Sequence, residues 1–255
     1  MVRQLVLILL ISHIIADFTV RREVLGKSRA RQTQWWPHIL VFVGLNLLAF
    51  LDIALLNGSI SAVPWAIYSS LVVEVALFHW LVDRLFQRTD LWDAEKVGPR
   101  ERWLYVIQQG LKVGFIFFAA GAVGAISLPV EPIVRPLAYV FGYVFSVFAG
   151  DAFVCLVLTR LTWTTDKEAI SESVAGGGRL IGIFEALLVT TFVIAHQYTA
   201  IGVILAAKSL ARFEWLKDHE GRAEYFLVGT LANLTWSALG GLLALRFAGR
   251  PLFPI

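Results

Sequence analysis

Residues 137–161 read LAYVFGYVFSVFAGDAFVCLVLTRL, a long apolar run whose charged members are Asp151 and Arg160. A helix needs about 20 apolar residues to cross the roughly 30 Å hydrocarbon core of a bilayer, so this run predicts a membrane-spanning helix. Further apolar runs lie on both sides of it, at 5–20, 38–56, 62–86, 103–128, 180–195, 199–211 and 225–247. Because the run at 199–211 is only about half the required length, we expect an all-α membrane bundle of about seven transmembrane helices.

The composition supports a membrane protein. Hydrophobic residues make up 58% of the 255 residues and Asp, Glu, Lys and Arg make up 16%, against about 45–50% and 25% in a soluble domain. These proportions exclude a disordered chain, and the single cysteine excludes a disulfide-stabilised secreted module. They also disfavour a soluble enzyme, because the polar residues are too few to cover a globule of this size. We expect one integral-membrane domain over 1–255, with halves at 1–128 and 137–255.

Loop charges predict how the bundle is oriented. Lys and Arg gather in alternate loops, at 18–37, 84–102, 159–179 and 208–224, and the loops between them are nearly free of both. The positive-inside rule places the basic loops in the cytoplasm. We therefore expect a protein of the bacterial cytoplasmic (inner) membrane with its N-terminus outside, in which 199–211 returns the chain inward as a short or tilted span or re-enters the membrane. Because this clustering reports topology, membrane lipid is an expected partner and nucleic acid is not.

Ionisable side chains interrupt several apolar runs, and two of these runs repeat one pattern. His13 and Asp17 form H-x-x-x-D in the first run, and His79 and Asp83 form it again in the third. Residues i and i+4 share one face of a helix, so each pair points in one direction. Charged groups inside a membrane cost about 2.5–3.5 kcal/mol on insertion scales and commonly mark function.

These polar residues are predicted to share a depth in the membrane. The distance of each H-x-x-x-D motif from the basic residues that follow it places both motifs about one turn from the cytoplasmic surface. The same reasoning brings four more polar residues to this depth: His38, Gln108, Lys112 and Glu185. We expect the motifs to meet, with His13 or Asp17 within hydrogen-bond or shared-metal reach of His79 or Asp83.

Imidazole and carboxylate groups form the usual ligand set for Zn²⁺, Mn²⁺ or Fe²⁺, which can activate a water molecule. The candidate catalytic residues are His13, Asp17, His38, His79 and Asp83, and the candidate metal ligands are His13, Asp17, His79 and Asp83. A structural interpretation stays open beside this one. A histidine in a membrane also hydrogen-bonds a neighbouring carboxylate simply to hold helices together.

At these motifs the sequence resembles a family of bacterial integral-membrane proteins of no established activity, the domain of unknown function 3307. The N-terminal resemblance consists of the H-x-x-x-D-F helix at 13–18, the histidine that opens the next helix, and the second H-x-x-x-D. The C-terminal matches are G-R-x-I-G-x-x-E at 178–185, Q-Y-x-A-I-G at 197–202, A-K-S-x-x-R at 207–212 and E-Y-x-x-x-G-T at 224–230. The resemblance covers most of the chain and is weakest at 87–150.

One position departs from the family pattern. The family motif D-Q-x-x-H implies a carboxylate and an imidazole where this chain has Gln108 and Lys112. An ammonium group repels a divalent ion, so we expect Lys112 to take the place of a metal such as zinc by pairing with Asp17 or Asp83. A looser similarity to membrane-bound metal-dependent hydrolases implies hydrolysis by His and Asp residues on helices.

A second group of candidate residues flanks the sixth apolar run, 180–195, in the sequence. Three glycines lead into Arg179 at the start of a predicted helix, an arrangement that can bind phosphate. With Lys208 and Arg212, Arg179 is a candidate for binding a lipid headgroup, and ordinary positive-inside anchoring is the alternative. Asp151 is a candidate for an ion path or for a hydrogen bond to a neighbouring helix.

Three functions are compatible with these residues. The first is a hydrolase-like membrane protein with a cytoplasm-facing His/Asp site that acts on a lipid or lipid-linked phosphate. The second is a transporter or channel-like protein in which Asp17, Asp83, Asp151 and Lys112 form a charge relay. The third is a membrane scaffold without catalysis.

Overall fold

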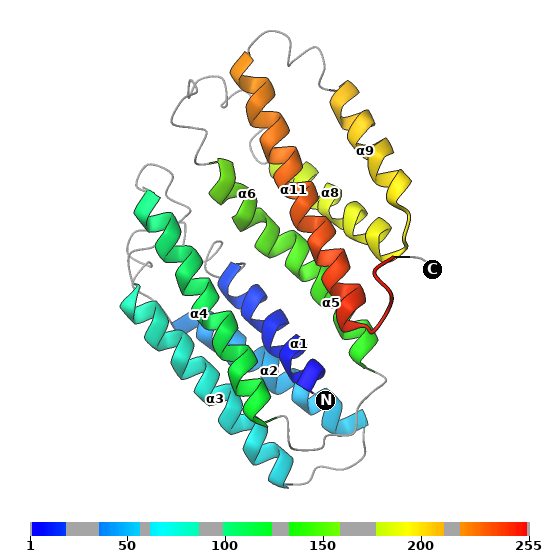
Figure 1. Cartoon of the computed structure of the whole chain (residues 1–255). Coiled ribbons are helices and arrows are strands. Elements are labelled where there is room, and N and C mark those ends of the chain that lie inside the picture. The colour runs from blue at the N-terminus through cyan, green and yellow to red at the C-terminus, as the bar shows by residue number, and fades with distance from the viewer. Residues whose placement is uncertain are drawn as a thin grey trace. The chain divides into compact units, whose positions relative to one another are not determined.

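Each apolar run forms a helix over the residues that are described in the structure, a computed structural model. These residues are 2–18, 36–56, 62–86, 99–123, 133–158, 177–211 and 220–253, and they contain no strand. The elements are α1 (Val2–Ile14), α2 (Trp36–Leu56), α3 (Ala62–Leu85), α4 (Pro99–Val123), α5 (Val134–Val144), the π-helix η2 (Phe145–Ala149), α6 (Gly150–Leu158), α8 (Gly177–Ile194), α9 (Tyr198–Ala211) and α11 (Glu220–Phe247), as Figure 1 shows. The prediction of an all-helical protein is confirmed for these residues.

Five helices in the described part of the chain are long and apolar enough to cross a membrane. They lie at Ala66–Leu85, Arg102–Ala122, Val134–Leu158, Gly177–Ile194 and Ala223–Phe247. Shorter apolar helices lie at Gln4–Phe18, Pro37–Ala49 and Tyr198–Leu210. These helices support the prediction of a membrane protein. The expected number of about seven transmembrane helices stays a prediction.

The N-terminal unit, Met1–Leu137, contains the helices α1 to α4. Within this unit α1 packs against α2 and α4, and α3 packs against α2 and α4. Every side chain from Gln4 to Leu10 is at most 5% exposed. A helix that is apolar on all sides is typically a buried one, and α1 is buried together with its polar end.

The C-terminal unit, Ala138–Ile255, is held by close approach of backbones. Its last helix, α11, packs against α6, η2 and α8. A Cβ atom placed on Gly240 would lie 2.1 Å from Ser146 Oγ, and one on Gly142 would lie 2.7 Å from Ala244 Cβ. Thr190 Oγ1 donates to Ser146 Oγ at 2.7 Å in the same contact region. Small residues and hydroxyl groups therefore let these helices touch, as is common in membrane bundles.

A tight turn joins α8 to α9. His196 has φ 57°, and the backbone N–H groups of His196 and Gln197 donate to Val193 O and Phe192 O. This is the Schellman pattern, in which one left-handed residue closes a helix. After this turn, the residues at 199–211 belong to one helix, α9. At 1.5 Å per residue, α9 is roughly 21 Å long.

Candidate functional site

The first H-x-x-x-D motif lies where α1 changes its helical geometry. His13 is in the last turn of α1, and Asp17 follows in a π-helical turn at 15–18. Both side chains are buried, and His13 Nδ1 lies 3.9 Å from Asp17 Oδ2. Single π-helical turns frequently occur at functional sites, and here one carries the carboxylate of the motif.

The second motif meets the first through its histidine. His79 Nδ1 lies 2.8 Å from Val75 O in its own helix, and His79 Nε2 lies 2.9 Å from His13 Nδ1. A carbonyl oxygen only accepts, so His79 donates from Nδ1, and in its neutral form Nε2 accepts the proton of His13 Nδ1. The prediction that the two motifs meet in space is confirmed by this contact.

Lys112 lies between the two aspartates. Its Nζ atom is 2.7 Å from Asp17 Oδ2 and 2.7 Å from Asp83 Oδ1, and its side chain is 0% exposed. Because α4 packs against both α1 and α3, it places this ammonium beside both carboxylates. The prediction that Lys112 pairs with Asp17 or Asp83 is therefore confirmed, and the lysine pairs with both.

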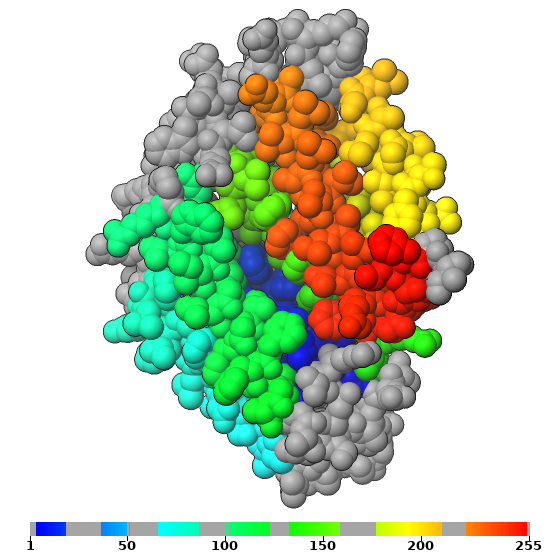
Figure 2. All heavy atoms as spheres, viewed as in Figure 1, coloured from blue at the N-terminus to red at the C-terminus, as the bar shows by residue number. Residues whose placement is uncertain are grey.

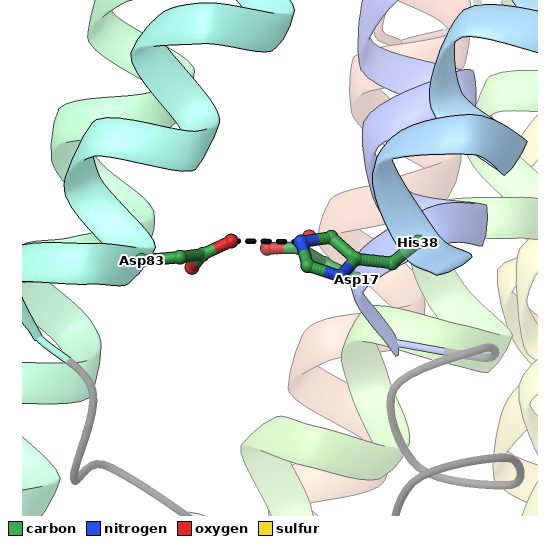
Figure 3. Close-up of side chains that lie close together, drawn as sticks. All are labelled: Asp17, His38 and Asp83. Carbon is green, nitrogen blue, oxygen red and sulfur yellow. Dashed lines mark hydrogen bonds and ion pairs between the residues drawn. The ribbon is translucent and has the colours of Figure 1, made fainter. Parts of the chain in front are cut away.

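Three further side chains complete the surroundings of the carboxylates. His38 Nε2 donates to Asp83 Oδ2 at 2.7 Å, and Figure 3 shows His38 and Asp83 pointing toward one another beside Asp17. Gln108 Nε2 donates to Asp83 Oδ1 at 2.5 Å, and Gln109 Nε2 donates to Asp17 Oδ2 at 3.2 Å. We call the residues His13, Asp17, His38, His79, Asp83, Gln108, Gln109 and Lys112 the N-terminal cluster.

The N-terminal cluster has more acceptors than cations. Asp17 and Asp83 share the ammonium of Lys112, and Asp83 also accepts a hydrogen bond from His38. Four buried atoms of the cluster that can accept a hydrogen bond have no partner among the described residues: His13 Nε2, Asp17 Oδ1, His38 Nδ1 and Gln109 Oε1. Unsatisfied acceptors are costly at buried positions, so the cluster favours a further hydrogen-bond donor or cation.

A divalent metal does not fit this arrangement. Asp17, His38 and Asp83 do offer ligand atoms within 4.8 Å of one another. A metal ion would lie about 2.0–2.2 Å from carboxylate oxygens, and the Lys112 ammonium already lies 2.7 Å from an oxygen of each aspartate. His79, one of the expected ligands, has both ring nitrogens engaged by Val75 O and His13. The ion and the ammonium would compete for one place.

The N-terminal cluster also lies within the range of a known family. A family model described as "Protein of unknown function (DUF3307)" matches residues 5–134, just over half of the 255 residues. The chain belongs to this family. No curated protein and no solved structure matched the chain. Every residue of the N-terminal cluster falls inside the matched range of the DUF3307 family, whereas the C-terminal motifs lie outside it.

The remaining sequence candidates of this DUF3307 protein lie in the C-terminal unit. Glu185 on α8 pairs with Lys208 on α9, with 2.5 Å between Oε2 and Nζ. Arg179 Nε lies 3.1 Å from Asp151 Oδ2. The two described cations that were expected to bind lipid headgroups thus have carboxylate partners in the chain, and the third, Arg212, lies outside the described residues.

Sequence reasoning missed Asn233, which completes the Glu185 pair. Asn233 Nδ2 donates to Glu185 Oε2 at 3.1 Å and to Gly182 O at 3.1 Å. The signal for it was present, because an amide inside the apolar run 225–247 carries the same kind of insertion cost that identified the histidines and aspartates. The partner of that amide was not readable, because it lies on another helix.

Proposed function

We propose that this DUF3307 protein binds and passes a small monovalent cation inside the membrane, with the N-terminal cluster as the binding site. The observation that carries the proposal is the placement of the fully buried Lys112 between two aspartates. The two carboxylates share this ammonium, and Asp17 keeps one buried oxygen, Oδ1, without a partner among the described residues, so that one monovalent cation or proton can bind there. Intramembrane carboxylates of this kind commonly mark ion paths and proton relays.

The outward faces of the same helices support a membrane setting for the cluster. Leu48 on α2, Leu77 on α3 and Phe118 on α4 are each more than half exposed, while the cluster residues are buried. These large apolar groups face outward and the ionisable groups of the cluster face inward, which is the arrangement that a lipid environment favours, although Glu74 of α3 is also exposed. The unpartnered Asp17 Oδ1 is the acceptor to which an entering cation is expected to bind.

Flux into proteoliposomes tests the proposal. Purified protein is reconstituted, and the uptake of H⁺ and of Na⁺ is followed under an imposed membrane potential. We expect uptake by the wild type above that of protein-free vesicles and at least a tenfold loss in Asp17→Asn. Glu224→Gln is the matched control, because it also converts a carboxylate to an amide but at an exposed position of α11. Wild-type uptake equal to that of protein-free vesicles, or an unchanged rate in Asp17→Asn, would contradict the proposal.

Hydrolysis of a lipid phosphate is the second candidate function. It is favoured by one observation, the closeness of the ligand atoms of Asp17, His38 and Asp83. These residues would hold a divalent ion such as Zn²⁺, which would supply an activated water, provided that Lys112 is displaced. Metal analysis of the purified protein separates the two functions.

Under the cation proposal we expect the wild type to purify without stoichiometric zinc. Lys112→His removes the competing ammonium and adds a ligand, and we expect it to raise zinc uptake, more so when combined with Gln108→Asp. Zinc bound tightly by the wild type would instead support the hydrolase and contradict the placement of Lys112 as the resident cation.

A further inference from the structure

The C-terminal unit contains an ion pair that the cation proposal does not use. Glu185 is 4% exposed, and its Oε2 atom accepts from Lys208 Nζ and Asn233 Nδ2. Its other oxygen, Oε1, is buried and has no partner among the described residues. A carboxylate at this depth in a candidate membrane-spanning helix needs a cation beside it, and half of its acceptor capacity is still available.

An aromatic ring forms part of the same site. Lys208 Nζ lies 5.3 Å from the centroid of the Phe226 ring. A ring face attracts a cation within about 6 Å, and aromatic groups combined with a carboxylate suit organic ammonium ions. The ammonium of Lys208 thus rests between the carboxylate of α8 and a ring of α11, close to the amide of Asn233.

Lys208 is less buried than its partner Glu185. Its side chain is 18% exposed, and it lies in the last turn of α9, which forms part of the surface of this unit in Figure 2. A lysine near a helix end can extend its flexible stem and move the ammonium toward water or headgroups. Glu185, in contrast, stays buried in the middle of α8.

We propose that Glu185, Phe226 and Asn233 form a binding site for a primary ammonium group, which Lys208 fills as an internal ligand. When Lys208 withdraws, the site takes the ammonium of an external amine. The ligand class follows from the group that the structure already holds there: a compact ammonium with hydrogen atoms for the carboxylate and a positive charge for the ring. A single carboxylate balances one charge, so a monovalent ligand is matched and a divalent one is not.

Chemical rescue tests this site with ethylammonium chloride as the probe. Lys208→Ala in the full-length protein vacates the site, and unfolding in detergent micelles is followed with increasing ethylammonium chloride at constant ionic strength. A ligand that binds only the folded state raises the free energy of unfolding by RT ln(1 + [L]/Kd), so the dependence on ligand concentration gives the apparent Kd. We expect ethylammonium to stabilise Lys208→Ala with an apparent Kd at least tenfold lower than in the wild type, where the tethered amine competes.

Two controls decide the result. Glu185→Gln combined with Lys208→Ala lacks the carboxylate, and we expect ethylammonium to have no more effect on it than NaCl has. Arg179→Ala removes the arginine beside the more exposed carboxylate Asp151 in the same unit, and we expect no preference for ethylammonium there. Equal stabilisation of Lys208→Ala by NaCl and ethylammonium, or rescue that survives the loss of Glu185, would overturn the proposal. Cation flux through the N-terminal cluster is measured separately, so either proposal can fail alone.

Discussion

Lys112 of the N-terminal unit is 0% exposed and lies between two aspartates, whereas Lys208 of the C-terminal unit is 18% exposed and pairs with one carboxylate among the described residues, that of Glu185. The first lysine lies in the interior of a helix, and the second lies in the last turn of one. The number of carboxylates therefore differs, and so does the freedom of the cation to leave. The first lysine is enclosed by both of its carboxylate partners, while the second lies at a helix end, where another cation could take its place.

The two units also differ in how their helices pack. In the N-terminal unit, Cβ atoms placed on Gly110, Gly114 and Gly121 would meet nothing within 4 Å. In the C-terminal unit, a Cβ atom on Gly241 would lie 2.7 Å from Val193 Cβ, and Gly142 and Gly240 are equally enclosed. The polar cluster is thus the distinctive contact of the first unit, and backbone contact is that of the second.

Removal of the buried lysine is expected to have the largest effect. Lys112→Met leaves Asp17 and Asp83 without their shared cation, and breaking a buried ion pair costs about 3–5 kcal/mol. Lys208→Met is the matched change in the other unit, and we expect less than half of that loss because Lys208 is partly exposed and Asn233 still donates to Glu185. The midpoint of unfolding in SDS measures both, and equal losses would remove the distinction between the two lysines.

A glycine contact provides the next largest effect. Gly240→Ala places a methyl group against Ser146 Oγ, and overpacking of this kind costs about 1–3 kcal/mol. Gly182→Ala is the matched control in the same unit, because its Cβ would meet nothing within 4 Å and alanine favours a helix by about 0.5–1 kcal/mol. We expect the two variants to shift the unfolding midpoint in opposite directions, and a stabilised Gly240→Ala would show that the helices of this unit are not in close contact.

The helices and most of the N-terminal cluster were predictable because their signals are local. An apolar run identifies a helix without knowledge of its neighbours, and a charge inside the run is conspicuous for its cost. The placement of Lys112 followed from the same reasoning, since a buried ammonium needs a carboxylate at its own depth. These expectations depend on position along a helix and on charge, and both can be read from one chain.

The sequence was a poorer guide to which side chains contact one another. The spacing of His79 and Asp83 suggested one pair acting together, but His79 contacts His13 while His38 contacts Asp83. Which histidine reaches which carboxylate depends on the rotation and crossing of neighbouring helices, and the sequence does not encode these in any single run. Contacts such as that between Gly240 and Ser146 depend on register in the same way.

The smallest expected effect compares the ends of two helices in the C-terminal unit. The α8 helix closes on His196 at φ 57°, and α11 closes on Gly249 at φ 70° with Arg250 N–H donating to Leu245 O. A non-glycine residue in this left-handed conformation costs about 1 kcal/mol. His196→Gly removes that cost but also the contact of 3.2 Å between His196 Nδ1 and the Tyr198 hydroxyl, so we expect a net gain of about 0.5 kcal/mol.

Gly249→Ala introduces the same cost at the end of α11, so we expect a loss of about 1 kcal/mol there. The opposite signs are expected because the backbone strain outweighs the lost contact at His196, and unfolding in SDS measures both. A loss of stability in His196→Gly would mean that the imidazole contact with Tyr198, which itself donates to Leu252 O at 2.9 Å, contributes more than the backbone strain costs. Polar side-chain contacts would then support the C-terminal unit as they support the N-terminal cluster, and the contrast between the two units would be smaller than their packing indicates.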